Sequence, residues 1–443
     1  MMIAAGPETR TYAEELSAKI TSRTARVGII GLGYVGLPLA IEFARAGFAV
    51  TGVDLNAGKV AEINRGRSYI GDVPAADVEQ FIRDGKLRAT TDFSAVRELD
   101  TINICVPTPL RKTKDPDMSY IVSACEEIAK YFHPGMLAIL ESTTYPGTTE
   151  EVLAPMLSRD GMEPGKEFFL CFSPERVDPG NPQYHTRNIP KVVGGMTPAC
   201  TEMGVRFYSQ ALTTVVPVES TQVAEMVKLL ENTFRMINIG LVNELAVMCD
   251  RMGINIWQVI EAAKTKPFGF MPFYPGPGLG GHCIPIDPFY LSWKSRQAGI
   301  EARFIDLAGY INGQMPEFTV AKIQNAMNAA GKPLKGARVH VVGVAYKSDI
   351  DDVRESPALD IIHILNRRGA TVTYSDPHVP ELRVDGMALA SIPLLPAAGD
   401  ADCAVIVTNH SAFDYDGLLR EAKLIVDTRN ALGRVNSEKV VRL

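Results

Sequence analysis

The sequence predicts an α/β protein in which one long helix joins two doubly wound parallel sheets. In the first and last parts of the chain, short apolar runs alternate with segments of helical spacing, which is typical of β-α-β units. Between these parts, the stretch from Glu219 to about Asp250 keeps helical apolar spacing and contains a glycine only at Gly240. The expected organisation is an N-terminal arm at 1–23, a first sheet domain at 24–213, a central helical region at 214–325 and a second sheet domain at 326–443.

Composition narrows the class of protein. A chain of 443 residues has room for two or three domains with full cores. Its net charge of −6, without a basic run, argues against a nucleic-acid partner. The seven cysteines form no C-x-x-C pair, which suits reduced thiols in the cytoplasm. Residues 1–23 have no signal-peptide core and no apolar run is long enough to span a bilayer, so we expect a cytoplasmic protein without membrane contact.

The first sheet domain opens with a glycine-rich strand-to-helix turn. The run Arg26–Ile30 reads as a buried strand, and the sequence Gly31-Leu-Gly-Tyr-Val-Gly36 leads from it into a helix over 37–44. A second strand over 48–53 ends at Asp54, about twenty residues after the glycines. A glycine-rich turn without a ligand is the alternative interpretation, but the strand, helix and acid together indicate a Rossmann-like dinucleotide site.

Each residue of this motif has a physical reason to be there. Gly31 makes the turn, Gly33 lets the backbone approach a pyrophosphate, and Gly36 lets the helix pack closely on the strand. The helix N-terminus faces the phosphate charge. Asp54 would bind the ribose hydroxyls and repel a 2′-phosphate, so we expect NAD rather than NADP.

Further strands of this domain end in polar or proline-bearing loops. They cover 101–106, 136–140 and 168–172, and the loops that follow them begin at Pro107, Glu141 and Ser173. Ligands of open parallel sheets gather at the carboxyl ends of the strands, so these loops are candidate site segments.

A cysteine in a glycine-rich loop is the main sign of chemistry in the central region. Gly278, Gly280 and Gly281 precede Cys283 and allow close approach of a ligand, and Asp287 stands four residues beyond the thiol. We expect Cys283 to be a nucleophile, the alternative being a core cysteine beside a tight turn. The long helix before it is expected to be either a connecting spine with a dimer interface or an internal core helix.

The second sheet domain lacks the glycine fingerprint. Its first strand ends at Gly343, which is followed by Val344-Ala-Tyr-Lys347. Further strands are expected over 370–374, 404–408 and 424–426, with a helix over 357–368. We therefore expect a fold of the same kind that binds something other than a dinucleotide.

Together these motifs resemble the UDP-glucose/GDP-mannose dehydrogenase family, in the family's order and over roughly residues 25–430. The form His-Cys-Ile-Pro-Ile-Asp is similar to the branch that acts on UDP-N-acetylhexosamines, and most to its enzymes for UDP-N-acetylglucosamine. The matching segments are Gly31-Leu-Gly-Tyr-Val-Gly-Leu-Pro38, Val106-Pro-Thr-Pro109, Glu141-Ser-Thr143, Ser173-Pro-Glu175, Lys228-Leu-Leu-Glu-Asn232, Gly280-Gly-His-Cys-Ile-Pro-Ile-Asp287 and Arg354-Glu-Ser-Pro357.

The resemblance implies an activity. The family oxidises the C6 alcohol of a UDP-sugar to a carboxylate in a four-electron reaction that uses NAD, needs no metal, and supplies surface polysaccharide precursors such as those of O-antigen or capsule. A homodimer or higher homo-oligomer is implied as well. The sugar alternatives are UDP-N-acetylmannosamine, UDP-N-acetylgalactosamine and UDP-glucose. Outside the family, an ordinary two-electron NAD enzyme and a non-catalytic NAD-sensing protein remain, and the number of NADH formed per substrate separates them.

The resemblance also implies roles for individual residues. Cys283 traps the aldehyde, Glu175 is the general base for water, and Lys228 with Asn232 holds the substrate oxygen. Asp287 orients a water or hydroxyl beside the thiol, and Thr143 positions water or nicotinamide. The implied cofactor residues are Gly31, Gly33, Tyr34, Val35, Gly36, Asp54, Lys59, Thr108, Thr143 and Arg354. The implied substrate residues are Glu175, Arg176, Lys228, Asn232, Tyr274, Gly280, Lys347 and Arg429.

Each polar candidate also has a structural interpretation. Glu175 and Arg176 could form a surface ion pair, and Lys228 and Asn232 could lie on a solvated helix edge. Asp287 could simply stabilise a turn. The cations Lys347, Arg354 and Arg429 could be surface charges, and His282 is expected to be structural because no His or Cys stands at zinc spacing from it.

Overall fold

The computed structural model describes residues 11–111, 115–178, 180–181 and 183–443. The chain divides into two compact units, Met1–Glu231 and Asn232–Leu443, and the division falls inside helix α8 (Thr221–Met252). This helix confirms the long helix that was predicted over 219–250. Within the predicted arm, Tyr12–Thr21 forms helix α1, and residues 1–10 lie outside the described part.

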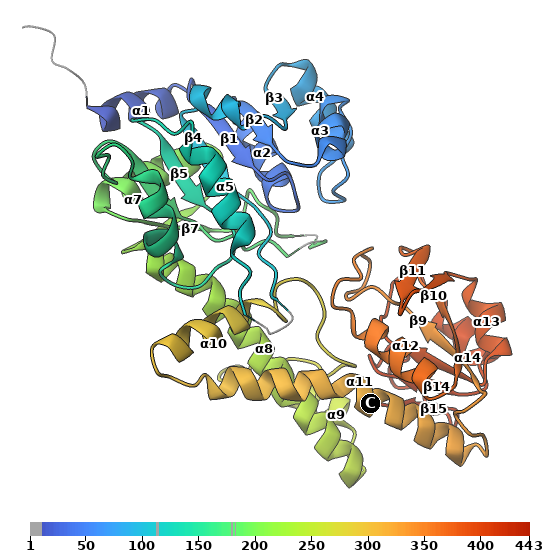
Figure 1. The fold of residues 1–443 in the computed structure, drawn as a ribbon. Helices are drawn as coiled ribbons and strands as arrows, with labels where there is room; N and C mark the ends of the chain where they lie inside the picture. The colour runs from blue at the N-terminus through green and yellow to red at the C-terminus, as the bar shows by residue number, and fades with distance from the viewer. Residues whose placement is uncertain (1–10, 112–114, 179, 182) are drawn as a thin grey trace, which may run out of the picture. The chain divides into compact units, whose positions relative to one another are not determined.

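Unit 1 is built on an eight-stranded sheet with the order β3-β2-β1-β4-β5-β6-β7-β8 (Figure 1). The order reverses between β1 and β4, so the loops after these two strands meet at the switch point where such sheets bind ligands. The strands are β1 (Arg26–Ile30), β2 (Ala49–Val53), β3 (Leu87–Thr90), β4 (Thr101–Ile104), β5 (Leu137–Leu140), β6 (Phe169–Phe172), β7 (Lys191–Gly195) and β8 (Val215–Val218).

One strand pair departs from the predicted parallel pattern. β6 and β7 pair antiparallel through Cys171↔Gly195 and Phe172↔Gly194, whereas the other neighbours in this sheet run parallel. A parallel neighbour needs a crossover, usually a helix. The described part of the connection, 173–190, holds no helix, and the chain turns back on itself.

Apolar side chains of the strands alternate between the two faces of this sheet. On β5, Leu137 and Ile139 belong to one buried cluster, and Ala138 and Leu140 belong to another, as expected for a sheet covered on both faces. The helices and helical turns of the unit are α2 (Gly36–Arg45), α3 (Ala57–Asn64), α4 (Ala75–Arg83), η1 (Phe93–Glu98), α5 (Ser119–Ala129), η2 (Thr149–Leu153), α6 (Ala154–Leu157) and α7 (Pro198–Tyr208).

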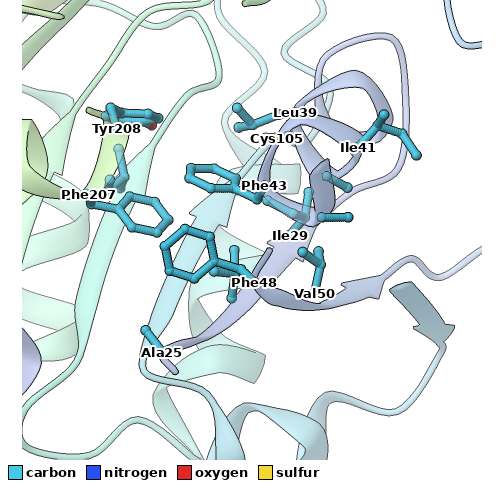
Figure 2. Packing of buried hydrophobic residues seen from close by; sticks show 14 of the residues in the cluster. Ala25, Ile29, Leu39, Ile41, Phe43, Phe48, Val50, Cys105, Phe207 and Tyr208 are labelled. Carbon is cyan, nitrogen blue, oxygen red and sulfur yellow. The ribbon is translucent and has the colours of Figure 1, made fainter. Parts of the chain in front are cut away.

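Aromatic rings join α2 and α7 on one face. Phe43 of α2 stacks on Phe207 of α7 with ring centroids 4.3 Å apart, and Phe48 meets both rings edge-on (Figure 2). Fully buried aromatic side chains contribute large apolar areas, and this packing fixes the helix that follows the glycine turn.

Unit 2 contains the rest of α8 and a second, five-stranded parallel sheet with the order β10-β9-β13-β14-β15 (Figure 1). Its order reverses between β9 and β13. The strands are β9 (Arg338–Val342), β10 (Thr371–Ser375), β13 (Cys403–Ile406), β14 (Ile425–Asp427) and β15 (Val440–Arg442), with a separate hairpin of β11 (Glu381–Val384) and β12 (Met387–Ala390). The helices are α9 (Ile256–Ala263), α10 (Asp287–Gln297), α11 (Arg303–Ala329), α12 (Pro357–Arg367), α13 (Leu394–Asp400) and α14 (Tyr415–Glu421).

The architecture confirms the predicted fold class of two Rossmann-like sheets linked by a long helix. Among the helices in the described part of the chain, none combines the length and the apolar character needed to cross a bilayer.

Candidate active site

The glycine turn of unit 1 has the close contacts that a dinucleotide site requires. A Cβ at Gly31, where φ is +91°, would lie 2.5 Å from the Cys105 carbonyl oxygen, and one at Gly36 would lie 1.9 Å from the Gly31 carbonyl oxygen. At Gly33 a Cβ would meet nothing within 4 Å, so this position opens onto space beside the backbone. The N-cap residue of α2, Val35, makes no side-chain capping bond, and the positive end of the helix dipole at this turn suits a phosphate. These residues fit a bound NAD.

Asp54 lies at the end of β2, beside this turn. One carboxylate oxygen accepts the Leu32 amide at 2.8 Å and the other accepts the Asn56 amide at 2.8 Å. Lys59 stands 3.9 Å from the same carboxylate. Tyr69, which was not predicted, donates its hydroxyl to the Leu32 carbonyl over 2.6 Å, and its ring lies under the Lys59 ammonium.

The loops after β4 and β5 are tied together. Ser142 donates its hydroxyl to the Val106 carbonyl at 2.8 Å, which links the Glu141-Ser-Thr143 segment to the Val106-Pro-Thr-Pro109 segment. Thr108 is buried and Thr143 is half-buried at this edge of the sheet. The predicted cofactor residues Thr108 and Thr143 therefore lie on neighbouring loops of unit 1.

Glu175 does not form a surface ion pair with Arg176, so the structural interpretation of these two residues is wrong. Its Oε1 accepts the backbone amides of Arg176 at 2.7 Å and Val177 at 2.8 Å. The Arg176 guanidinium instead pairs with Glu231 at 2.5 Å. Burial would raise the pKa of Glu175, but the Lys191 charge, the two amides and the Lys228 charge outweigh it, so the pKa lies below its ordinary value. Glu175 is thus an ionised, half-buried carboxylate.

Lys228 is 7% exposed and acts electrostatically on Glu175, so it is not on a solvated helix edge. Asn232, one turn further along α8, is equally buried. In unit 2 the Asn232 amide donates to the Asp287 carboxylate at 2.5 Å. Asp287 opens α10, and its own amide donates to the Cys283 carbonyl at 2.8 Å. The predicted residues Asn232, Cys283 and Asp287 therefore come together within unit 2.

Cys283 is exposed, and the other six cysteines are buried. Its loop has positive φ values at Gly278 and Gly281, and the Gly281 amide donates to the Arg354 carbonyl at 3.0 Å. Cβ atoms at Gly280 and Gly281 would lie 2.6 and 2.8 Å from the Tyr346 side chain. Tyr346 therefore supports the cysteine loop, a contact that no motif predicted.

Arg429 is partly buried and lies against the same loop region, so the interpretation as a surface charge is wrong for it. A Cβ at Gly276 would come within 2.5 Å of its Nη1, and its Nε donates to the Val407 carbonyl at 2.8 Å. Burial lowers the pKa of Arg429 to about 10, which leaves it a cation at neutral pH. The Gly276 amide is itself held by Asn243 of α8.

The remaining predicted residues are more dispersed. Lys347 is half-buried in the loop after β9, and Arg354 is exposed and pairs with Asp352 at 2.6 Å. Arg354 belongs to unit 2, whereas the other predicted cofactor residues belong to unit 1. Tyr274 stacks on Trp257 with centroids 6.1 Å apart and donates to Glu261.

One group of side chains in unit 2 has metal-ligand chemistry. Ligand atoms of Asp349, His378 and His410 lie within 4.8 Å of one another. However, His410 Nδ1 accepts the Asp349 amide at 2.9 Å, so Nε2 carries the proton and donates to Asp376 at 2.9 Å. Neither nitrogen of His410 then offers a lone pair to an ion, and the expectation of no metal stays a prediction.

Comparison with known proteins places these features in a family. Residues 25–212 match the NAD binding domain of the UDP-glucose/GDP-mannose dehydrogenase family, residues 222–314 its central domain and residues 340–434 its UDP binding domain. The UDP-N-acetyl-D-glucosamine 6-dehydrogenase of Pseudomonas aeruginosa is 36% identical over 90% of this chain and 94% of its own. The UDP-N-acetyl-D-mannosamine dehydrogenase of Salmonella typhi is 36% identical over 91% and 98%.

Solved structures agree with this assignment. The UDP-D-ManNAc dehydrogenase of Pyrococcus horikoshii superposes with a TM-score of 0.86 at 32% identity, over 94% of this chain and 98% of that one. The family's NAD binding domain includes the glycine turn and Asp54, and its UDP binding domain covers most of the second sheet, from within β9 to beyond β14. The chain therefore belongs to the UDP-glucose/GDP-mannose dehydrogenase family and is an NAD-dependent oxidoreductase of UDP-sugars.

Proposed function

We propose that this protein oxidises the C6 primary alcohol of UDP-N-acetylglucosamine to the carboxylate, through a thiohemiacetal and a thioester on Cys283. The observation that carries the proposal is the setting of that thiol. Cys283 is exposed, whereas the other six cysteines are buried, and its loop contains two glycines of positive φ. Asp287, four residues further on, is buried and hydrogen-bonded to Asn232 of α8. A structural cysteine needs none of this.

The first oxidation gives an aldehyde. NAD held at the glycine turn of unit 1 would supply the hydride acceptor for each of the two oxidations. Lys228 and Asn232 are one helical turn apart on α8 and hence share a face, where an ammonium and an amide stabilise the substrate oxygen as its proton leaves. Thr143, after β5, orients water or the nicotinamide beside it.

The second half needs a covalent intermediate. The Cys283 thiolate adds to the aldehyde carbon, and loss of hydride from the thiohemiacetal leaves a thioester. Glu175 takes a proton from water, the water oxygen attacks the thioester carbon, and the carbon–sulfur bond breaks to release the carboxylate and restore the thiol. One alcohol, one water and two NAD give one carboxylate, two NADH and three protons.

The uridine diphosphate end is assigned to the second sheet. Lys347 and Arg429 follow strands of that sheet at their carboxyl ends, and a planar guanidinium suits phosphate or uracil. Gly280 and Tyr274 would complete the substrate contacts, together with Arg176. We assign NAD binding to 24–213, with Arg354 reaching it, and the dimer contacts to 214–325.

The choice among sugars rests on the cysteine motif. His282-Cys-Ile-Pro-Ile-Asp287 favours an N-acetylhexosamine, and UDP-N-acetylglucosamine is our first choice among these. Relatives of nearly equal identity are named for the mannosamine and galactosaminuronate compounds. UDP-N-acetylmannosamine and UDP-N-acetylgalactosamine are therefore the alternatives, followed by UDP-glucose. The product would be a precursor of a surface polysaccharide, made in the cytoplasm.

A homodimer is proposed from α8. Within unit 2 this helix exposes large apolar side chains at heptad-like spacing, which places them on one face. The side chains of this face are Phe234, Leu241, Leu245, Met248 and Met252. Light scattering of the purified protein tests the homodimer, and a monomeric mass would contradict it.

The function is tested with purified protein, NAD and a panel of UDP-sugars. The expected result is two NADH per UDP-N-acetylglucosamine consumed, with the acid as product. One NADH per sugar would indicate an ordinary two-electron enzyme, and binding of NAD without turnover of any sugar would indicate a sensor. Faster oxidation of another hexosamine would replace the proposed substrate while leaving the chemistry in place.

A further inference from the structure

The ammonium of Lys191 is buried between two carboxylates in unit 1. Lys191 opens β7, and its side chain is 5% exposed. Its Nζ lies 2.5 Å from Glu141 Oε2, 3.2 Å from the Pro174 carbonyl and 3.4 Å from Glu175 Oε2. A buried ammonium is strongly destabilising unless it is paired and hydrogen-bonded, so this arrangement is a specific one.

Glu141 is fixed as the anchor of that ammonium. Its Oε1 accepts the Asn103 amide at 2.8 Å and also the Tyr208 hydroxyl, and its Oε2 receives Lys191. Burial raises the pKa of Tyr208, so its hydroxyl keeps the proton that it donates. Burial alone would lower the pKa of Lys191, but the charges of Glu141 and Glu175 raise it. The lysine is therefore held as a cation in one place.

Glu175 is oriented from two sides. Its Oε1 is occupied by the amides of Arg176 and Val177, whereas Oε2 receives the longer contact from Lys191. We propose that Lys191 is a positioning residue of the reaction, which keeps Glu175 ionised and keeps its Oε2 in place to take a proton from water. This inference rests on the proposed role of Glu175 as the base for thioester hydrolysis.

The charges around Glu175 explain why Lys191 matters. Glu141 shares the Lys191 cation with Glu175, and Lys228 of α8 is the other cation that acts on Glu175. The Arg176 guanidinium is engaged by Glu231. The Cys105 thiol after β4 also interacts with Glu175, but burial raises its pKa and keeps it neutral. Without Lys191, Glu175 would keep the Lys228 charge and its two backbone amides but lose the cation that its Oε2 contacts directly.

The test compares four variants. Lys191→Met removes the cation, Lys191→Arg restores a charge, and Glu141→Gln removes the anchor alone. The double variant Lys191→Met/Glu141→Gln removes both buried charges and so remains able to fold if the single methionine variant does not. The Glu175 carboxyl is followed by ¹³C NMR of glutamate-labelled protein, with Glu175→Gln for assignment. Turnover is followed as the pH profile of kcat, with KM for NAD and for the UDP-sugar.

In both methionine variants the Glu175 titration should move up by at least about one pH unit, and the acidic limb of kcat should move with it. Glu141→Gln and Lys191→Arg should keep the titration low, and both KM values should change less than about threefold in all variants. An unchanged Glu175 titration in a folded methionine variant overturns the proposal. The titration needs no substrate, so a wild-type protein that oxidises no UDP-sugar refutes the proposed function separately.

Discussion

The Asn232 amide donates to the Asp287 carboxylate over 2.5 Å, and both side chains are buried. A buried carboxylate requires a donor, and this bond ties α8 to the first turn of α10, directly after the Cys283 loop. It also commits one of the two amide protons of Asn232. The bond therefore fixes the orientation of the Asn232 side chain within unit 2.

Cys283→Ser should stop turnover at or near the aldehyde. A hydroxyl has a much higher pKa than a thiol and gives an ester less readily than a thiolate gives a thioester, so acid formation should fall by at least about 10³-fold. Product analysis by mass spectrometry measures acid and aldehyde, and Cys249→Ser, at a buried cysteine of α8, is the matched control. Acid production by the Cys283 variant at the wild-type rate would rule out the covalent mechanism.

Local patterns predicted the fold where they were strong. The strand Arg26–Ile30 and the helix at 357–368 appear within one residue of their expected bounds, since apolar periodicity and flanking turns act locally. The reversal of β7 was not predictable, because strand direction depends on pairing with a distant segment. Strand β8 was missed since Pro217 cannot donate to a ladder and argues against a strand.

The same contrast holds at the site. The glycines, Asp54 and Cys283 stand in short motifs whose spacing has a physical reason. Lys191 and Tyr69 belong to no such motif, because each contacts a partner far away in the sequence. Lys191 contacts Glu141, and Tyr69 contacts the Leu32 carbonyl. Only the folded domain brings such pairs together.

Asp54→Ser should weaken the binding of NAD and reduce the preference of the enzyme for NAD over NADP. The variant loses the proposed acceptor for the ribose hydroxyls and the charge proposed to repel a 2′-phosphate, and it also releases the Leu32 amide. Loss of one charge-assisted hydrogen bond predicts about 10- to 100-fold lower kcat/KM with NAD. Steady-state kinetics with both cofactors measure this. A wild-type enzyme that uses NADP as well as NAD would contradict our interpretation of Asp54.

Arg429→Ala should raise KM for the UDP-sugar by about 10- to 100-fold and leave KM for NAD nearly unchanged, since the proposed guanidinium contact with phosphate or uracil is lost. Gly276→Ala should have a similar effect, because its Cβ would lie 2.5 Å from Arg429 Nη1 and displace that group. Gly313→Ala on α11, where a Cβ meets nothing within 4 Å, is the control. If NAD binding is lost and the sugar is unaffected, the two sheets have been assigned to the wrong ligands.

Glu225 should make stability depend on pH. This side chain is 1% exposed on α8 and accepts the Gly147 amide at 2.6 Å, the Thr149 amide at 2.9 Å and the Thr149 hydroxyl at 2.7 Å. Burial raises its pKa from 4.5 to about 7, against the opposing effect of these three donors. Between pH 4.5 and about pH 7, the Glu225 carboxyl is therefore protonated in the folded state and ionised in the unfolded state.

The free energy of unfolding that Glu225 contributes should fall as the pH rises from about 4.5 to about 7, by up to about 3 kcal/mol, and level off above that. Glu225→Gln cannot ionise, so the wild-type minus variant difference should carry this slope. The variant also turns an amide toward the Gly147 N–H, which destabilises it by about 1–3 kcal/mol at every pH. Urea unfolding at several pH values separates the slope from this constant offset. A difference that does not change with pH would show that the three donors hold Glu225 ionised throughout.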